Sequence, residues 1–557
     1  MTTLKNSKSQ DILFINLPPV SPELLKTDDV TSADNLTPPL GLLYLANSII
    51  DCPFVGSYKC VDFAIYDYGR LLEKKTMGKF VSEKMQNVGI EKPNIIAISL
   101  IFSSSYEFFK IVIAEIKKCW PDAIVIVGGI HASNNVAYLL RKHSEIDYIA
   151  CGEGEEVFVE FIEMIAAGKQ KNIFGVHSVN NIKKVKGNQF ERTKFVEKLS
   201  IDYTRYHNMI DMKLYTTGTS LFSLSKTTLS VRSFAIMASR GCPYHCTFCA
   251  AHTVHGRDQR WRSMYNVVDE INWLNKTYGV TKYYLIDDNF LPKSKVIEFF
   301  HTLSSINIKD FEVVIQNMSI NSTDFEIIDA IIAANITNNI AFAIESGVSR
   351  IQKKIKKNVN LNKAIELVKY SQSRGLNVRC FFIIGFPGET VEEMKKTFEY
   401  AKKLGADWST FNVAAPIPGT EMYEEFVELG YILDGPSSWT ATSLRDRVFD
   451  SKEISGKEIK ELAYRANLDI NFVNNMNIRK DEYKNAEIIF SNFIKKWNFH
   501  IFAYDSLRRI YKETGEKQAE NDIINQMKMV LASNKKAQLF CKYFDLLDDD
   551  IRRILEA

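Results

Sequence analysis

The sequence predicts an α/β protein of about three to four domains, in which a doubly wound parallel sheet is followed by a partial barrel and a helical region. Two stretches, residues 1–190 and 231–428, alternate strand-like and helix-like segments. After residue 428 only helical spacing with charged faces remains. Hydrophobic residues make up 46% of the 557 and charged residues 25%, which is ordinary for a globular protein with a well-packed core.

The first unit, residues 1–190, resembles a Rossmann-like domain in its order of elements. Apolar, β-branched runs indicate buried parallel strands, and amphipathic segments between them indicate helices. A sheet of this kind binds its ligand at the carboxyl ends of its strands, where glycine pairs also occur here. We predict strands at 12–17, 95–100, 124–127 and 148–150, and helices at 41–50, 107–119 and 157–167.

The second unit, residues 231–428, follows a mixed polar segment that we interpret as a linker over 191–230. Six strand–helix repeats predict a partial (β/α)6 TIM-like barrel, whose chemistry is expected at the carboxyl ends of the strands. We predict strands at 234–237, 283–286, 312–316, 340–344, 378–384 and 408–413. We predict helices between them at 266–278, 293–304, 323–334, 361–374 and 391–404, and in the C-terminal region 429–557 at 454–475, 484–496, 498–514 and 520–532.

Composition limits the partners of the chain. The net charge is +3, with 70 basic and 67 acidic residues, which gives no electrostatic case for nucleic acid or an anionic membrane. The lysine run 353–357 is expected to be a solvated helix face. No stretch reaches the 18–20 apolar residues of a membrane span, and the start of the chain lacks the apolar segment of a signal peptide. Nine cysteines, odd in number and sparse, favour a reducing cytoplasm over a disulfide scaffold.

Three of these cysteines carry the strongest chemical signal. Cys242, Cys246 and Cys249 lie within eight residues directly after a predicted barrel strand. Thiolates are soft ligands for iron–sulfur clusters and for zinc. Three of them hold three corners of a cubane and leave the fourth iron open to a chelating substrate. A zinc site completed by His245, His252 or His255 is an alternative, and so is packing of unrelated cysteines.

The C-x3-C-x2-C spacing resembles the signature of the radical S-adenosylmethionine (SAM) superfamily, in which an aromatic residue commonly precedes the last cysteine. Phe248 occupies that place. The resemblance implies a 4Fe–4S cluster on Cys242, Cys246 and Cys249, which chelates SAM and cleaves it reductively to a 5′-deoxyadenosyl radical.

Further segments resemble the same family in order along the chain, and they imply the residues that would bind SAM. After the second barrel strand, Asp287 and Asp288 are expected near the SAM amino group, although an Asx turn that caps the next helix is an alternative. Glu345, in Ala-Ile-Glu-Ser-Gly, is expected near the ribose or the methionyl end. Gly385 and Gly388, in Gly-Phe-Pro-Gly-Glu, are expected beside the adenine.

The first unit resembles the B12-binding domain of cobalamin-dependent radical SAM proteins. The segments that match are Pro38 to Ala46, Gly128-Gly129-Ile-His-Ala and Gly152-Glu-Gly-Glu-Glu. By this resemblance Gly128, Gly129 and Gly152 are cofactor-binding positions. The D-x-H-x-x-G motif is missing, so base-off cobalamin without a histidine beneath the cobalt is expected; His131 is more typical of a loop histidine than of a ligand.

The resemblance implies a cobalamin-dependent methyltransferase that acts on an unactivated carbon or phosphorus of a small molecule or peptide. An external one-electron donor of the flavodoxin or ferredoxin kind would reduce the cluster. Three alternatives stay open: a non-methylating cyclase, rearrangement or oxidative enzyme on the same scaffold, a metal-stabilised binding protein without turnover, and a methylthiotransferase with a second cluster. For a second cluster, Cys52, Cys60, Cys119 and Cys151 supply no obvious set of ligands. Arg260, Trp261 and Arg262 could approach substrate or cobalamin, but a packed entrance to the next helix is the favoured interpretation.

Overall fold

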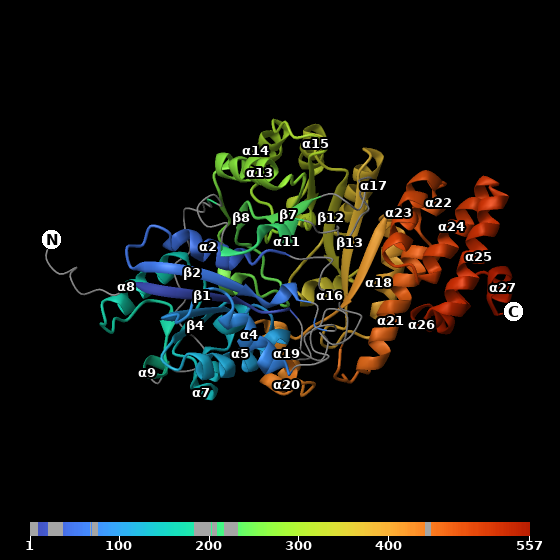
Figure 1. Cartoon of the computed structure of the whole chain (residues 1–557). Helices are drawn as coiled ribbons and strands as arrows, with labels where there is room; N and C mark the ends of the chain where they lie inside the picture. Colours follow the sequence, from blue (N-terminus) through green and yellow to red (C-terminus); the bar gives the residue numbers. More distant parts are fainter. Residues whose placement is uncertain are drawn as a thin grey trace.

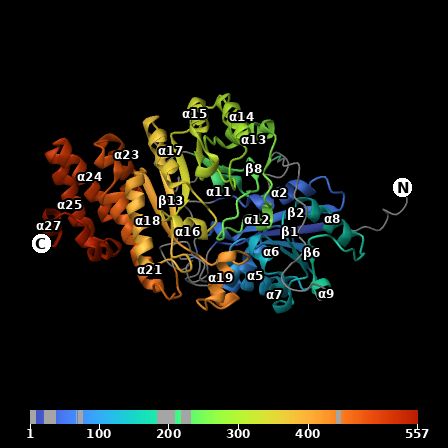
Figure 2. The same ribbon diagram turned by 180° about the vertical axis from the view of Figure 1, so that it is seen from behind.

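The computed structural model describes residues 9–19, 37–66, 68, 76–182, 202, 209–216, 232–439 and 447–556. Most of the predicted linker 191–230 therefore lies outside the described residues. Figures 1 and 2 show the N-terminal domain at one end of the molecule, the barrel in the middle and the C-terminal helices at the other end.

The N-terminal domain is a six-stranded sheet in the order β2-β1-β3-β4-β5-β6, in which only β6 runs antiparallel to its neighbour. The reversal of chain order between β1 and β3 creates the crevice where doubly wound sheets bind ligands. The strands are β1 (Gln10–Asn16), β2 (Val55–Asp62), β3 (Ile95–Ser99), β4 (Ile124–Gly128), β5 (Tyr148–Ala150) and β6 (Val176–His177). The main helices are α2 (Leu40–Ile49), α4 (Met77–Gln86), α5 (Tyr106–Cys119), α7 (Val136–Lys142) and α8 (Glu155–Ala166), with the short α6 (Ile130–Asn134) after β4 and the short α9 (Val179–Ile182) after β6.

Two hydrophobic cores hold this domain because each face of the sheet is covered by helices. Helices α2 and α8 pack on one face, and their core continues without a break into the barrel. Helices α4, α5 and α7 pack on the other face, where Trp439 from beyond the barrel is also buried. The N-terminal domain and the barrel are therefore packed together rather than tethered by a linker alone.

The barrel is a six-stranded parallel arc made of two three-stranded sheets, β7-β10-β11 and β12-β13-β14. A parallel bridge between Met318 and Phe342 joins the two sheets. The strands are β7 (Ser233–Ile236), β10 (Lys282–Leu285), β11 (Glu312–Ile315), β12 (Asn339–Glu345), β13 (Asn377–Ile384) and β14 (Trp408–Val413). The helices are α13 (Met264–Tyr278), α14 (Lys293–Ser304), α15 (Phe325–Ala334), α17 (Leu361–Ser373) and α18 (Val391–Leu404).

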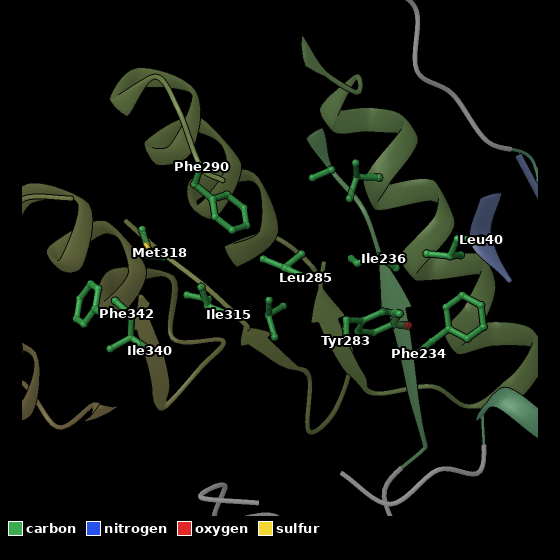
Figure 3. Close-up of a cluster of buried hydrophobic side chains, with 14 of the residues drawn as sticks. Leu40, Phe234, Ile236, Tyr283, Leu285, Phe290, Ile315, Met318, Ile340 and Phe342 are labelled. Carbon is green, nitrogen blue, oxygen red and sulfur yellow. The ribbon is translucent and has the colours of Figure 1, made fainter. Parts of the chain in front are cut away.

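Smaller elements surround the carboxyl ends of the barrel strands. They are the two-stranded pair β8 (Ser239–Arg240) and β9 (Arg260–Trp261), and the helices α11 (Met212–Thr216), α12 (His252–His255), α16 (Ser349–Lys354), α19 (Glu421–Glu428) and α20 (Pro436–Trp439). Figure 3 shows how apolar side chains of β7, β10, β11 and β12 pack in one cluster, with Leu40 of the N-terminal domain close by.

The C-terminal region has a hydrophobic core of its own. Its helices are α21 (Gly456–Leu468), α22 (Met476–Arg479), α23 (Tyr483–Lys496), α24 (Ile501–Thr514), α25 (Lys517–Ser533), α26 (Lys535–Gln538) and α27 (Asp549–Glu556). Helix α21 continues into a short π-helix at Asp469–Val473. This region covers the outer edge of β14. The amide of Asn471 pairs with both backbone groups of Ser409 (2.7 and 2.6 Å), and that of Asn467 pairs with both of Phe411 (3.2 Å each). Two side chains thus take the place of a seventh strand.

The predicted fold class is confirmed: a doubly wound parallel sheet, a partial barrel and a helical C-terminal region. All six predicted barrel strands occur within a few residues of their expected bounds. The edge strand β2, the helix α4 and the short α6 and α7 had no prediction. Within the described residues, no helix is long and apolar enough to cross a bilayer.

Candidate active site

The loop that carries Cys242, Cys246 and Cys249 lies between β8 and α12, at the carboxyl end of β7. Backbone hydrogen bonds fix it at its start and in the middle: Cys242 N to Gly256 O (3.3 Å), and Thr247 N to the carbonyl of Ile355 beyond α16 (3.1 Å). The loop begins with Gly241 at φ 94°, where an added Cβ would lie 2.2 Å from the carbonyl oxygen of Asp258. Only glycine satisfies both demands, so the chain can turn sharply just before the first cysteine.

Within the described residues, the three thiols are not placed as ligands of one metal ion. All three cysteines are free and partly exposed. Among the described residues, no group of three His, Cys, Asp or Glu side chains is placed to hold one metal ion. Zinc requires its ligands close together around one atom, whereas a cubane spreads three thiolates over three irons. The zinc alternative therefore gains no support.

Burial opposes ionisation of the Cys246 and Cys249 thiols in the metal-free chain. It raises the pKa of Cys246 to about 11, and it also raises the pKa of Cys249. Metal binding needs the thiolate form, so iron must displace protons when it enters the loop. Fixed positive charge nearby favours this exchange, and the structure supplies it in Lys357.

Lys357 corrects one expectation from the sequence. The run 353–357 was expected to be a solvated helix face, but the Lys357 side chain is only 11% exposed and its Nζ lies 3.1 Å from Oε1 of Glu345. Burial lowers the pKa of Lys357, but the negative charges of Glu345 and Cys246 outweigh it and raise the pKa overall. The ammonium therefore stays charged beside the cluster loop.

Glu345 is held in an unusual backbone conformation. It ends β12 at φ 71°, where the register between β12 and β13 shifts, and its side chain is buried. A left-handed conformation in a residue other than glycine stores strain and often marks a functional site. The amide of Gln352 donates to the carbonyls of Ile344 and Ser346 (2.7 and 2.6 Å) on either side and keeps this bend in place.

The two aspartates after β10 hold the start of the cluster loop. The carboxylate of Asp287 accepts hydrogen bonds from the backbone N–H of Ala238 and Ser239 and from the Ser239 hydroxyl. Burial raises the pKa of Asp287 to about 7, against these donors. Asp288 accepts from the N–H of Gly241 (3.0 Å). In this structure both carboxylates are engaged by the protein itself.

The two glycines of the β13 turn differ. Gly385 has φ 81°, and an added Cβ would lie 2.1 Å from the terminal methyl group of Ile459 in α21, so a side chain here would displace Ile459. Gly388 has open space around it at φ 68°. Next to Gly388, Glu389 is fully buried and accepts from the N–H groups of Gly385 and Phe386 (2.7 and 3.1 Å). The ring of Phe248 packs against that of Phe386, with centroids 5.8 Å apart.

The carboxyl edge of the N-terminal sheet presents glycine and apolar surface. An added Cβ on Gly129 would lie 2.7 Å from the carbonyl of Leu100, so this glycine serves the packing of β3 against β4. An added Cβ on Gly128 would meet only the carbonyl of Ala150, at 3.9 Å, so there is space beside this glycine, whose own carbonyl accepts from the N–H of Leu100 (2.8 Å). Beside it, Ile101 and Phe102 are 39% and 51% exposed at the end of β3. This apolar edge fits the face of a corrin ring.

His131 lies inside the domain rather than on this edge. Its Nδ1 is 2.8 Å from the Ser103 hydroxyl, and its ring meets that of Trp439 edge-on at 4.5 Å. Burial lowers its pKa to about 3, so the ring is neutral. The side chain is packed among aromatic rings, but His131 lies in the short helix α6 rather than in the loop that was expected.

The Gly152 loop joins the N-terminal domain to the cluster loop through charge. Gly152, at φ 96°, donates its N–H to Ser133 (3.2 Å). The next residue, Glu153, has a fully buried side chain that binds Arg260 through both oxygens (2.6 and 2.8 Å). His255 Nδ1 lies 3.1 Å from the same carboxylate, and Arg240 lies 3.5 Å from it.

Further contacts join the N-terminal domain to the barrel. We call the interface formed by these contacts and those of Glu153 the seam. Arg240 also binds Glu155 (2.6 Å) at the start of α8, and its guanidinium lies 4.7 Å from the ring centre of Tyr44. Asn134, at the end of α6, donates to the Thr253 hydroxyl (3.2 Å) and to the carbonyl of Pro418 (3.0 Å). Residues that follow β4 and β5 at the carboxyl edge of the N-terminal sheet therefore contact residues around the cysteine loop and after β14.

Sequence reasoning missed several of these residues. Glu153 lies inside the Gly152-Glu-Gly-Glu-Glu motif, but nothing in the sequence named its cationic partners. Lys357 lies in a run of lysines, and for Arg260 packing at the entrance to a helix was favoured over an approach to substrate or cobalamin. Trp261 and Arg262 do pack as expected: Trp261 lies against Phe290, and Arg262 forms a buried ion pair with Glu270 (2.5 Å).

Two family models match the chain, the B12 binding domain over residues 27–162 and the radical SAM superfamily over residues 236–401. Together they cover strands β2 to β5 of the N-terminal sheet, the cysteine loop and strands β10 to β13 of the barrel. The chain is a B12-binding-domain radical SAM protein. As a radical SAM enzyme, it belongs to a group whose cofactors are a 4Fe–4S cluster and SAM.

Curated relatives of this radical SAM protein include methyltransferases. It is 27% identical over 465 residues to an uncharacterized methyltransferase of Pyrococcus horikoshii, covering 82% of this chain and 92% of the relative. It is 28% identical over 412 residues to the cytidylyl-2-hydroxyethylphosphonate methyltransferase of Streptomyces wedmorensis, covering 68% and 75%. An anaerobic magnesium-protoporphyrin IX monomethyl ester cyclase of Cereibacter sphaeroides is 24% identical over 407 residues, covering 71% and 61%.

Two solved structures share the fold of this radical SAM protein. The cobalamin-dependent SAM radical enzyme OxsB aligns over 98% of this chain and 83% of its own, with a TM-score of 0.60 and 14% identity. The radical SAM methyltransferase TsrM of Kitasatospora setae aligns over 75% of each chain, with a TM-score of 0.56 and 18% identity. At these identities the likeness concerns the fold alone.

Proposed function

We propose that this radical SAM enzyme is a cobalamin-dependent methyltransferase that acts on an unactivated carbon or phosphorus of a small molecule or peptide. The observation that carries the proposal is the seam: the carboxyl edge of the B12-binding sheet faces the cysteine loop of the barrel. Asn134 and Glu153, which follow β4 and β5, both contact residues next to that loop. A methyl carrier on one edge would then lie near a radical formed at the other.

The cofactors supply the difficult chemistry: the cluster and SAM a carbon-centred radical, and cobalamin a transferable methyl group. The chain binds and orients them. Cys242, Cys246 and Cys249 would hold three irons, and Glu345 and Lys357 form a charged pair beside the loop that suits the two charged ends of an amino acid. Gly128, Ile101 and Phe102 would carry the corrin.

Asp287 and Asp288 have a second role to be weighed. Their carboxylates hold the backbone of residues 238–241 in place, so in our proposal they shape the cluster loop as well as facing the SAM amino group. Gly388 has the space to lie along an adenine, whereas Gly385 is enclosed by α21.

The test is an anoxic assay that needs no knowledge of the substrate. Purified chain is supplied with iron, sulfide and hydroxocobalamin, and then with SAM and dithionite. Iron, sulfide and cobalt are measured per chain, and 5′-deoxyadenosine and S-adenosylhomocysteine are followed by mass spectrometry. We expect all of them in the wild type and no 5′-deoxyadenosine in Cys246→Ala, while Cys541→Ala, at an exposed position in the C-terminal region, behaves as wild type.

The outcomes separate the alternatives. A chain that forms 5′-deoxyadenosine but binds no cobalt and forms no S-adenosylhomocysteine is not a cobalamin-dependent methyltransferase; the similarity to a cyclase makes this the second candidate. A chain that forms neither product after cluster reconstitution is not a radical enzyme. The electron donor, for which dithionite stands in, is proposed to be a flavodoxin or a ferredoxin.

A further inference from the structure

Glu153 is a completely buried carboxylate at the seam between the domains. Its side chain has no exposed surface, and it belongs to the N-terminal domain, directly after the glycine that follows β5. The three basic side chains that surround its carboxylate, Arg260, His255 and Arg240, all come from the barrel. These charge contacts therefore join the two domains rather than two parts of one domain.

A carboxylate is not buried this way without a cause. Removing it from water costs far more than an ordinary hydrogen bond returns, unless opposite charge surrounds it. Here the two guanidiniums of Arg240 and Arg260 balance the two carboxylates of Glu153 and Glu155, and Arg260 binds in the two-pronged geometry that fixes direction as well as distance. Such networks contribute specificity of arrangement more than stability.

The three basic partners of Glu153 lie close to the cluster cysteines in the sequence. Arg240 lies two residues before Cys242, and His255 and Arg260 lie six and eleven residues after Cys249. Residues on both sides of the cysteine loop therefore contact the same buried carboxylate, that of Glu153. Gly241, between Arg240 and Cys242, is held in the sharp conformation described above and allows little slack between Arg240 and the first thiol.

We propose that Glu153 is a positioning residue, which fixes the open corner of the cluster relative to the carboxyl edge of the B12-binding sheet. The carboxylate gathers both ends of the cysteine loop and sets the separation of the two cofactors. The proposal rests on the proposed function for its chemistry, since that separation matters only if a methyl group moves between them. Its structural part stands independently of cobalamin.

The first experiment measures amide hydrogen exchange on the anoxically purified chain with its iron–sulfur cluster and without cobalamin. We expect Glu153→Gln to speed exchange of the amides in residues 241–262 by about tenfold or more, while those of β13 change by less than about twofold, since only a local opening is released. Glu163→Gln, the same substitution at an exposed position of α8, should match wild type throughout. Glu155→Gln, which keeps Glu153, should give an intermediate increase.

The alternative is that Glu153 merely stabilises the fold. In that case Glu153→Gln would speed exchange by one factor in all the slowly exchanging strands, and that result overturns the proposal, as does no change in residues 241–262. If Glu153→Gln does not fold, Arg260→Lys replaces it, because lysine keeps the charge but loses the two-pronged contact. Local release in Arg260→Lys supports the proposal, and an unchanged loop refutes it.

The second experiment tests the separation itself. With cob(II)alamin added and the cluster reduced, pulsed electron paramagnetic resonance measures the distance between the two spins. One narrow distance is expected for wild type and Glu163→Gln, and a broadened or displaced one for Glu153→Gln. An unchanged narrow distance in Glu153→Gln refutes the positioning role. If wild type shows no signal from bound cobalt at all, the proposed function fails, while hydrogen exchange still decides whether Glu153 holds the cysteine loop.

Discussion

Replacement of Glu389 by glutamine should remove the contribution of one buried carboxyl to the pH dependence of stability between pH 5.5 and 7.5. Glu389 follows β13 and is fully buried. Its Oε2 accepts two backbone N–H groups, while Oε1 is buried with no hydrogen-bond partner among the described residues. Burial raises the pKa of this carboxyl from 4.5 to about 8. Protonation of Oε1 removes the buried negative charge, which is unfavourable because only one of the two carboxylate oxygens accepts hydrogen bonds within the described residues.

Proton linkage determines whether stability rises or falls with pH. Because the folded-state pKa is raised, the folded chain keeps a proton that the unfolded chain has released at the same pH. The stabilising contribution of the protonated carboxyl is complete below about pH 4.5 and is lost as the pH rises towards about 8. One proton corresponds to about 1.4 kcal/mol per pH unit, so wild type should lose about 3 kcal/mol relative to Glu389→Gln between pH 5.5 and 7.5.

Glutamine preserves the shape and keeps an oxygen for the two N–H donors, but it carries no charge at any pH. Urea unfolding of wild type and variant, measured in parallel at several pH values, isolates the contribution of Glu389, because all other titrating groups cancel in the difference. Glu392→Gln, an exposed position in the first turn of α18, is the matched control and should run parallel to wild type. If Glu389→Gln also runs parallel to wild type, the carboxyl is already ionised in the folded protein and our reasoning is wrong.

Three further predictions concern the cluster loop and the packing of Trp439 on the N-terminal domain. Cys242→Ala should lose iron, sulfide and visible absorption after reconstitution, whereas Cys380→Ala, buried within β13, should keep them. Gly241→Ala should abolish cluster loading, because its Cβ would meet a carbonyl at 2.2 Å; Gly375→Ala, also at positive φ but in open space, should load normally and lose only about 1 kcal/mol in a urea melt. Trp439→Ala should lower the free energy of unfolding by about 3–5 kcal/mol, since it empties a fully buried site among aromatic rings, and a loss below about 1 kcal/mol would contradict the packing described.

Strand and helix periodicity predicted the barrel well because its elements bury regular faces. The segments 408–413 and 293–304 were placed at their observed bounds. The edge strand β2 escaped prediction because only its last residues are buried, so it lacks the continuous apolar run of β1 and β3. Short α6 and α7 carry too few turns for a helical period to show.

The cysteines of the candidate site were predictable because their spacing is local. Lys357 and the partners of Glu153 were not, since their roles depend on contacts between segments about 100 residues apart or on burial within a charged run. Gly129 and Gly385 show the converse. Their positions suggested close approach of a ligand, but the structure accounts for both through packing against protein.

The hydrogen bonds between the side-chain amides of Asn467 and Asn471 and β14 determine where this chain can be truncated. A partial barrel has an edge strand whose outer N–H and C=O groups would be unpaired. Such an edge can pair with a strand of another molecule. Truncation of the chain after the last strand–helix repeat would expose the backbone groups of Ser409 and Phe411 at this edge. Fragments that end there should self-associate, and expression of the catalytic half by itself would call for the helix from 456 to 468 and its continuation to be kept.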